Sequence, residues 1–396
     1  MGLNFFDIVI WWLVLEIIGF AALPIASHIC VNLKDKGYSL SKPLGLLLLT
    51  YISWLLSVFW FRYTYFSVLF SAVVIAACSV IVFWKKKPLI AEKNYIIKFE
   101  ILFFLAFVIF ALIRAYSPDI YWTGGEKFMD MTFINSLLRT VQFPPSDPWM
   151  SGTIVQYYYF GYLMVADLIK ITGVFSSIAF NLATASFFAL SLTTAFGIGY
   201  ALTERIRYGI ITAFFVTIAG NLVGFFQLMD TLLKGDVVNG ILSFNYWLSS
   251  RVIPDTINEF PYFSFLQGDV HPHMISITFQ LLVVLLLVSI FKSRTPGIFS
   301  IAILGLSIGF LYPLNTWDYP VYLILAISVM IIGFFMKNRS WSASKKEILK
   351  PVSAAGAVAL ISFILYLPYH LSYKLERTIS LVPSGRTSVI FYFAVY

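Results

Sequence analysis

The sequence has little charge and little cysteine. Only 12% of its 396 residues are charged, whereas 60% are hydrophobic, and soluble globular chains of this length do not normally have this balance. The two cysteines, Cys30 and Cys78, lie in or beside apolar stretches, so they say nothing about the redox compartment. The scarcity of charge excludes an ordinary soluble domain and predicts a polytopic membrane protein.

Long apolar stretches predict the transmembrane spans. A hydrocarbon core is about 30 Å thick, and a helix needs about 20 apolar residues to cross it. Ten stretches are near or at this length, at residues 5–29, 43–60, 67–84, 101–113, 178–202, 210–226, 274–291, 298–312, 321–336 and 352–367. The first lacks the basic region and cleavage site of a signal peptide, so we interpret it as a span. We expect an all-α polytopic bundle of about 10–11 spans, forming a single domain over residues 1–396.

The net charge of +8 does not indicate nucleic-acid binding, because the basic residues flank the spans. We assign their loops to the cytoplasm, namely residues 34–42, 85–98, 205–207, 292–294 and 337–350. The extracytoplasmic side then receives the loops at residues 114–160, 228–273, 313–319 and 369–387. We expect a multi-pass protein of the cell membrane, in contact with membrane lipids, whose chemically interesting loops all face outward.

The segment 157–174 conflicts with this topology. It is apolar enough to be a span, but a full crossing there would reverse the orientation of everything that follows. We therefore expect it to be interfacial or re-entrant, or to pair with a second short crossing within residues 175–202.

A first candidate site lies in the loop 114–160. Apolar residues recur at helical spacing there, so residues 126–141 are predicted to form an amphipathic helix along the membrane. Glu126 and Asp130 are four residues apart, which places both carboxylates on one face of the first turns. Such a pair can act as a general base with its orienting partner, or bind a divalent cation. The alternative is helix capping, with Lys127 as the counter-charge.

A second candidate site ends the loop 228–273. Asp269, His271 and His273 alternate, and Pro272 is expected to keep the backbone extended, so that the three side chains point the same way. This set can ligate a divalent metal (Mg²⁺, Mn²⁺ or Zn²⁺) or bind a substrate phosphate. The alternative is a structural, hydrogen-bonded turn.

Two further outer segments carry polar groups. Asn315, Trp317 and Asp318 occupy a tight turn between two spans, where an acid can contact sugar hydroxyls or a metal. Arg377 lies in the loop 369–387, and guanidinium groups are natural partners of phosphate oxygens. We include all four residues among the candidate substrate contacts.

The run Gln156-Tyr157-Tyr158-Tyr159-Phe160-Gly161 is preceded by Pro-Pro-x-Asp-Pro-Trp and followed much later by Gly-Asp-x-His-Pro-His. This combination resembles an uncharacterised prokaryotic family of polytopic membrane proteins named for its YYY run. That family is in turn similar to the GT-C superfamily of glycosyltransferases, which take sugars from polyprenyl-phosphate carriers on the outer side of the membrane.

The GT-C resemblance is one of layout, and it implies roles for particular residues. Residues 99–396 would form a GT-C-like module with outer loops at 114–160 and 228–273, behind a three-span extension at 1–98. Glu126 stands in the place of the essential acid at the start of the outer loop. The chain departs from the usual pattern in having four spans before that loop, and in placing its second acid four residues away from the first.

The stretch 144–162 corresponds to the proline-containing turn and the aromatic segment that follow the amphipathic helix in that layout. Asp147 is expected to point into a polar cavity, with Trp149 nearby. Tyr157, Tyr158 and Tyr159 can offer ring faces to a sugar, or form an aromatic belt at the interface.

These observations lead to one functional hypothesis and two rivals. The first is inverting transfer of a sugar from a polyprenyl-phosphate donor to an unidentified acceptor, with Glu126 as the base and Asp130 beside it. The second is an ion-coupled transporter or lipid flippase, for which Glu16 is the clearest ionisable residue inside a span. The third is a metal-dependent membrane hydrolase that uses Asp269, His271 and His273 around an activated water.

Overall fold

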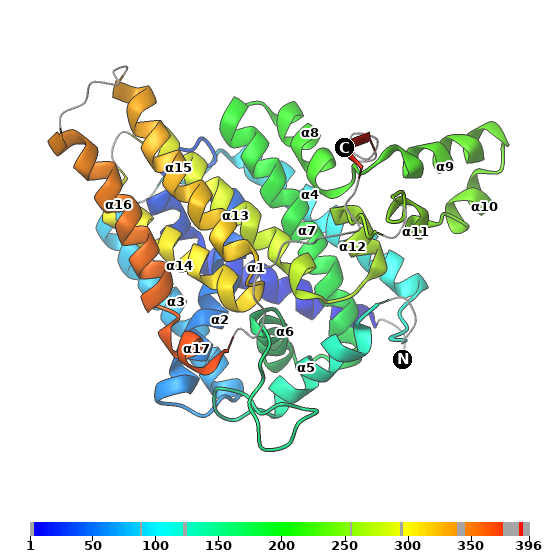
Figure 1. Ribbon diagram of the computed structural model, residues 1–396, viewed down its shortest axis with the longest axis horizontal. Coiled ribbons are helices and arrows are strands. Elements are labelled where there is room, and N and C mark those ends of the chain that lie inside the picture. Colours follow the sequence, from blue (N-terminus) through cyan, green and yellow to red (C-terminus); the bar gives the residue numbers. More distant parts are fainter. Residues whose placement is uncertain are drawn as a thin grey trace.

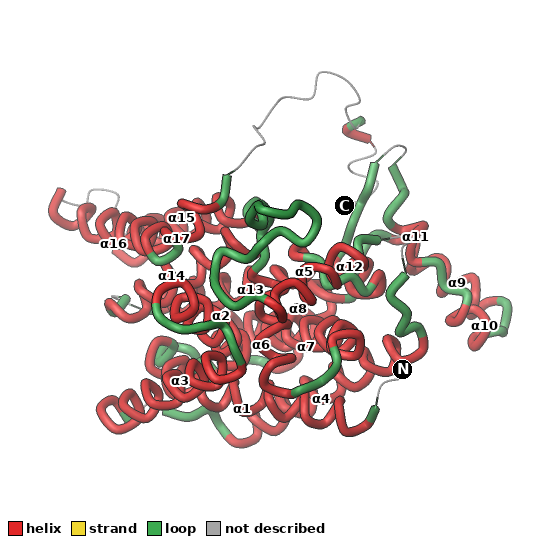
Figure 2. Tube along the Cα trace, turned by 90° about the horizontal axis from the view of Figure 1, so that it is seen from below, coloured by secondary structure: helices red, strands yellow, loops and turns green. Residues whose placement is uncertain are grey.

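The computed structural model describes residues 4–87, 89–121, 125–253, 256–293, 296–338, 345–374 and 388–390. Over these residues the backbone forms helices joined by turns and loops, without a strand (Figure 2). A single isolated bridge joins Ser146 and Ile154 within this part of the chain. The prediction of an all-α polytopic bundle is confirmed.

The first half of the chain contains several long apolar helices, a 3₁₀ turn and two shorter helices. In chain order they are α1 (Phe5–Ile29), the 3₁₀ turn η1 (Tyr38–Leu40), α2 (Ser41–Phe59), α3 (Tyr65–Lys86), α4 (Lys93–Tyr116), α5 (Lys127–Arg139), α6 (Phe160–Thr172) and α7 (Ser176–Thr203).

The second half begins with shorter helices, continues with four longer ones and ends with a short one. They are α8 (Ile206–Thr217), α9 (Leu222–Leu233), α10 (Val237–Leu242), α11 (Tyr246–Ser249), α12 (Pro261–Gln267), α13 (Pro272–Lys292), α14 (Ile298–Leu314), α15 (Asp318–Asn338), α16 (Lys345–Ile364) and α17 (Leu367–Ser372). In Figure 1, α5 and α17 lie along the lower edge of the bundle, while α9 and α10 project to the right.

Among the described residues, seven helices are long and apolar enough to cross a membrane, or eight if α8 and α9 count as one broken span. Two further apolar helices, α14 and the segment Leu349–Ile364 of α16, are shorter. The protein is therefore a multi-pass membrane protein, and its described part contains fewer full-length spans than the 10–11 expected.

The predicted span at residues 210–226 is wrong as a straight helix. α8 ends at Thr217, and α9 begins at Leu222 after a bend of 101°. Asn221 starts α9: its side-chain oxygen accepts a hydrogen bond from the amide of Val223, and its side-chain nitrogen donates to the carbonyl of Ser249. Such a cap satisfies groups that a helix end leaves free, so it stabilises the break.

The core of the bundle is built around α7. In its most apolar 18-residue window 94% of the residues are buried, compared with 33% in α1 and 17% in α15. The sequence of α7 is rich in Ala, Ser, Thr and Gly, and such small side chains let helices approach closely in a membrane. The outer helices instead present exposed apolar side chains, as a lipid-facing surface requires.

The ambiguous segment 157–174 contains α6, a helix of 13 residues that is buried along most of its length. At 1.5 Å per residue it spans about 20 Å, less than the hydrocarbon core. It packs against α5, α2 and α3 and ends at Gly173, whose φ of +71° turns the chain into α7. Protein surrounds this helix, so it is not exposed to lipid along most of its length.

Three of the predicted basic loops meet at one end of the bundle. Oε2 of Glu204 lies 4.0 Å from Nζ of Lys34, and Oε1 of Glu204 lies 3.9 Å from Nζ of Lys292. These contacts join the segments that follow α1, α7 and α13. The clustering agrees with the sorting of the loops by charge.

Candidate functional site

The N-terminus of α5 carries the first predicted pair. Glu126 is the residue immediately before the helix, and Asp130 lies in its first turn. Both carboxylates reach Nδ1 of His271, at 3.1 Å from Oε2 of Glu126 and 3.3 Å from Oδ1 of Asp130. Their i, i+4 spacing therefore places them on one face. Lys127 points elsewhere, with its Nζ 4.4 Å from the centre of the Tyr121 ring, and burial lowers its pKa.

The two carboxylates differ in what they can do. The Glu126 side chain is 59% exposed, whereas that of Asp130 is completely buried. Oδ1 of Asp130 also accepts a hydrogen bond of 2.6 Å from the hydroxyl of Tyr162. Glu126 can therefore touch a ligand, whereas Asp130 can only hold its neighbours in position. This separates the roles of two residues that the sequence treats as one catalytic pair.

Asp269 holds the loop in front of α5. Its Oδ2 accepts a hydrogen bond of 3.0 Å from the backbone amide of Glu126, 143 residues away along the chain. A side chain on Gly125 would collide with Asp269 and with Gln267, so the backbone approaches this closely only at a glycine. Burial raises the pKa of Asp269 to about 6, although the Glu126 amide opposes the shift.

His271 lies between the acids and the tyrosines. Burial lowers the pKa of its imidazole, but Asp130, Glu126 and Asp269 together outweigh this effect and raise the pKa above 6.5. Its Nε2 lies 3.5 Å from the hydroxyl of Tyr157. The site therefore favours an imidazolium whose Nδ1 faces two carboxylates.

Two cavities meet at Glu126 and His271. The first, of about 390 Å³, is lined by Gly125, Glu126, Trp247, Arg251, Glu259, Phe263, Ser264, Gln267, Asp269, His271, His273 and Met274. The second, of about 470 Å³, is lined by Glu126, Met129, Gln156, Tyr157, Tyr158, His271, Thr316, Trp317, Tyr373 and Lys374. Glu126 and His271 are common to both linings, so one carboxylate faces two separate chambers.

The three consecutive tyrosines have different surroundings. Tyr157 stacks on Phe133, with ring centres 5.3 Å apart, and on Tyr158, at 4.1 Å. Tyr157 and Tyr158 line the second cavity. Tyr159 is buried in the core, where its hydroxyl accepts a hydrogen bond from the indole of Trp54. Two of the three are therefore placed to meet a ligand.

The expectation that Asp147 points into a cavity is wrong. Its Oδ1 accepts hydrogen bonds from the amides of Trp149 and Met150, at 2.8 and 2.9 Å, and so fixes a tight turn. Trp149 is largely exposed and packs edge-on against Phe133. Neither residue lines the two cavities, so the proline-rich stretch shapes the loop.

The turn between α14 and α15 contributes two residues to the site, Thr316 and Trp317. Both line the second cavity. Oδ2 of Asp318 accepts hydrogen bonds from Ser276, Gln280 and Asn315, at 2.5, 2.7 and 2.9 Å. Asp318 and Asn315 therefore join α13 to the start of α15. Arg377 lies outside the described residues.

Asp269, His271 and His273 do not converge on one point as three metal ligands would. The backbone predicted to be extended through Pro272 is helical from that residue, because proline is well tolerated in the first turn of a helix, and here it starts α13. Nε2 of His273 lies 3.1 Å from Oε2 of Glu259, while His271 faces α5. Among the described residues, no three His, Cys, Asp or Glu side chains are grouped so that they could hold a metal ion.

The sequence reading missed several residues of the first cavity. The guanidinium of Arg251 lies 4.8 Å from the Trp247 ring centre, and Glu259 pairs with His273. Arg251 is the single arginine between residues 208 and 293, a signal that could have singled it out. Tyr162, which donates to Asp130, is hidden in an apolar helix and gives no such signal.

A third, apolar groove lies on the other side of α12. Its volume is about 580 Å³, and its lining comes from α4, α7, α8, α9, α12 and Phe244. α12 turns Tyr262, Phe265 and Leu266 toward this groove, and Phe263, Ser264 and Gln267 toward the polar cavity. One helix of seven residues thus separates an apolar space from a polar one.

The sequence was compared with models of known protein families. Residues 48–396 match the model of the family described as Uncharacterized membrane protein (DUF2298). The chain belongs to this family. No curated protein and no solved structure was found to match the chain.

The match places the candidate site within the family's shared region. It begins at Leu48, inside α2, and contains the residues of both cavities and of the apolar groove. α1 and the start of α2 precede it. The description of the family establishes a membrane protein and names no activity.

Proposed function

We propose that the protein transfers a sugar from a polyprenyl-phosphate carrier to an acceptor hydroxyl on the extracytoplasmic face of the cell membrane. The observation that carries this proposal is the meeting of two cavities at Glu126. A transfer reaction needs two substrates on either side of one reacting centre. A hydrolase needs one chamber and water, and a two-chamber site with a shared carboxylate suits transfer better.

Glu126 is the general base in this scheme. Its carboxylate is exposed to ligand and lies 3.1 Å from the imidazole of His271. It accepts the proton of the acceptor hydroxyl as that oxygen attacks the anomeric carbon, while the phosphate leaves from the opposite face and the configuration inverts. His271, held by Asp130, positions the carboxylate.

The donor fits the first cavity, because that cavity adjoins the apolar groove across α12. A polyprenyl phosphate has a long hydrocarbon chain and a charged head, which matches an apolar groove beside a polar chamber. Arg251 lines that chamber, and its guanidinium can bind phosphate oxygens through charge-assisted hydrogen bonds. The acceptor then occupies the second cavity, against the rings of Tyr157, Tyr158 and Trp317.

The direct test is transfer by the purified protein in lipid, with a panel of labelled polyprenyl-phosphate hexoses. We expect Glu126→Gln to lower the rate by about 10²- to 10⁴-fold, the usual contribution of a general base. The matched control is Asp230→Asn, at an exposed acid of α9, which should keep the wild-type rate. Transfer that survives Glu126→Gln would contradict the assignment of the base.

A binding measurement separates the donor site from the chemistry. We expect Arg251→Gln to weaken binding of a polyprenyl phosphate, as followed by native mass spectrometry, while Glu126→Gln retains it. Equal binding by both variants and the wild type would remove the first cavity as the donor site.

A proton- or ion-coupled transporter is the second candidate. One observation favours it, namely that Lys42 lies between the carboxylates of Glu16 and Glu100, among helices that are long and apolar enough to cross a membrane. Ionisable groups inside such helices usually serve transport or proton transfer. Uptake measurements in proteoliposomes decide between the two, because a glycosyltransferase does not accumulate solute.

A further inference from the structure

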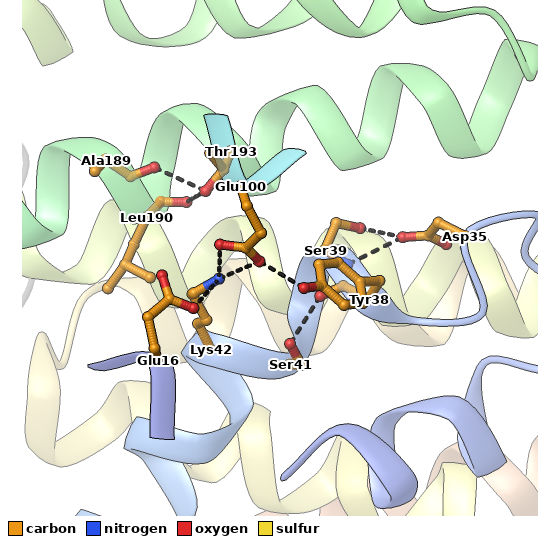
Figure 3. A network of polar contacts seen from close by, with 10 residues as sticks. All are labelled: Glu16, Asp35, Tyr38, Ser39, Ser41, Lys42, Glu100, Ala189, Leu190 and Thr193. Atoms are coloured by element: carbon orange, nitrogen blue, oxygen red, sulfur yellow. Dashed lines mark hydrogen bonds and ion pairs between the residues drawn. The ribbon is translucent and has the colours of Figure 1, made fainter. Parts of the chain in front are cut away.

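A buried charged network joins α1, η1, α2 and α4. Figure 3 shows the ammonium of Lys42 between the carboxylates of Glu16 and Glu100. Its Nζ lies 3.0 Å from Oε2 of Glu16, and 2.6 and 2.7 Å from the two oxygens of Glu100. The hydroxyl of Tyr38 donates a hydrogen bond of 2.6 Å to Glu100. Among the described residues, Lys42 and Glu100 are the charged groups that act on Glu16, and Tyr38 lies beside them.

The side chain of Lys42 is enclosed by aromatic rings and by the backbone of α1. Its side chain is 4% exposed, and its Nζ lies 4.6 Å from the ring centre of Phe103 and 5.3 Å from that of Phe99. Aromatic faces attract an ammonium group through their quadrupole. A methyl group on Gly19 would lie 2.5 Å from Cγ of Lys42, so the lysine lies directly against the backbone of α1.

The charges of this cluster do not balance. Two ionised carboxylates and one ammonium would leave a net charge of −1 among apolar helices, and an uncompensated buried charge is costly. Glu16 is 7% exposed, and its Oε1 is buried without a hydrogen-bond partner. An ionised Glu16 would leave negative charge on that unpaired oxygen, whereas a protonated carboxyl group would leave it neutral.

We propose that Glu16, Lys42 and Glu100 form a proton-binding site within the membrane-embedded bundle. The site holds one exchangeable proton, shared by the two carboxylates, beside a charged lysine. The carboxylate of Glu100 is 25% exposed, so it provides the route by which the proton enters and leaves. No feature of the proposed sugar transfer requires this proton.

The proton site is separate from the candidate active site. Glu100 and Arg114 are 14 residues apart on α4, which corresponds to about 21 Å along a helix. Arg114 lies at the end near Asp269, where a methyl group on Gly268 would be 2.5 Å from its Nη1. Loss of one site therefore does not imply loss of the other.

Infrared spectroscopy of the full-length protein in lipid tests the proposal, because the carbonyl stretch of a protonated carboxyl group is distinct from carboxylate bands and shifts in D₂O. At neutral pH, Glu16→Gln should remove one protonated carboxyl band. Glu100→Gln should also remove it, since the remaining carboxylate then pairs with Lys42 without a proton. Lys42→Gln should add one such band.

The control is Glu92→Gln, at an exposed acid just before α4, which should leave the spectrum unchanged. If neither Glu16→Gln nor Glu100→Gln changes the protonated carboxyl region, the proposal is overturned. It is also overturned if adding Na⁺ shifts the carboxylate bands of this cluster, because a metal cation then supplies the missing charge. If Glu16→Gln does not fold, the spectrum of Glu100→Gln alone tests the proposal. Measuring sugar transfer in the same variants separates this proposal from the proposed function, because the proton site is not needed for transfer.

Discussion

The imidazole of His271 links three parts of the chain that the sequence holds far apart. It faces Glu126 and Asp130 from α5, 141 residues away in the case of Asp130, and Tyr157 from the stretch before α6. Each of these contacts favours a fixed orientation of the ring. These contacts stabilise the protonated imidazole more than the neutral one, because two carboxylates lie within 3.3 Å of Nδ1.

Stability should therefore depend on pH through His271. Its pKa is raised above 6.5 in the folded protein, so its stabilisation is complete below pH 6.5 and is lost as the pH rises through the folded-state pKa. We expect the midpoint of thermal unfolding in detergent to fall as the pH rises above 6.5, because the imidazolium loses its proton and with it the attraction of the two carboxylates. Asp269, with its pKa raised to about 6 from 3.8, acts below this window.

Substitution identifies the group responsible for that fall. His271→Gln should flatten the dependence above pH 6.5, whereas His273→Gln, at an exposed imidazole, should leave it in place. An equal fall in the wild type and in His271→Gln would show that another group titrates.

At the scale of elements, close helix crossings depend on glycine. α1 and α2 pack where a methyl group on Gly45 would lie 2.6 Å from the carbonyl oxygen of Ile18. A backbone atom cannot move aside as a flexible side chain can, so the added methyl must push the helices apart. This crossing also brings Lys42 against α1.

Gly45→Ala should accordingly destabilise the protein by about 1 to 3 kcal/mol, the usual cost of overpacking. Gly356→Ala, in α16, is the matched control, because nothing lies within 4 Å of the added methyl and alanine favours the helix. Thermal unfolding of the two variants in one detergent measures the difference. A stable Gly45→Ala variant would refute the close crossing.

At the scale of the whole molecule, the charge pattern predicts which face meets the cytoplasm. Lys86, at the end of α3, belongs to a basic loop, whereas Ser151 and Asp236 are exposed in the loops assigned to the outer side. The proposed extracytoplasmic site requires the last two to share a compartment that the first does not reach.

Membrane-impermeant labelling of single cysteines checks this topology. In a Cys78→Ser background, with Cys30 buried, Ser151→Cys and Asp236→Cys should react from outside intact cells, and Lys86→Cys only after permeabilisation. Labelling of Ser151→Cys and Asp236→Cys from opposite sides would separate the loops that form the two cavities.

The sequence by itself determined the class of protein and the local pairings. A hydrophobic content of 60% indicates a membrane protein, because too few polar side chains remain to cover the surface of a soluble fold. The i, i+4 spacing of Glu126 and Asp130 decides that both face one side, because helix geometry is local.

Only the tertiary structure decided which residues meet. The burial of Asp130, the separation of Tyr159 from its two neighbours and the pairing of Glu259 with His273 depend on contacts between distant segments. The break at Asn221 and the burial of α6 also depend on such contacts. An apolar stretch has the same sequence pattern whether lipid or protein surrounds it. The two chambers at Glu126 exist because packing brought the loops together.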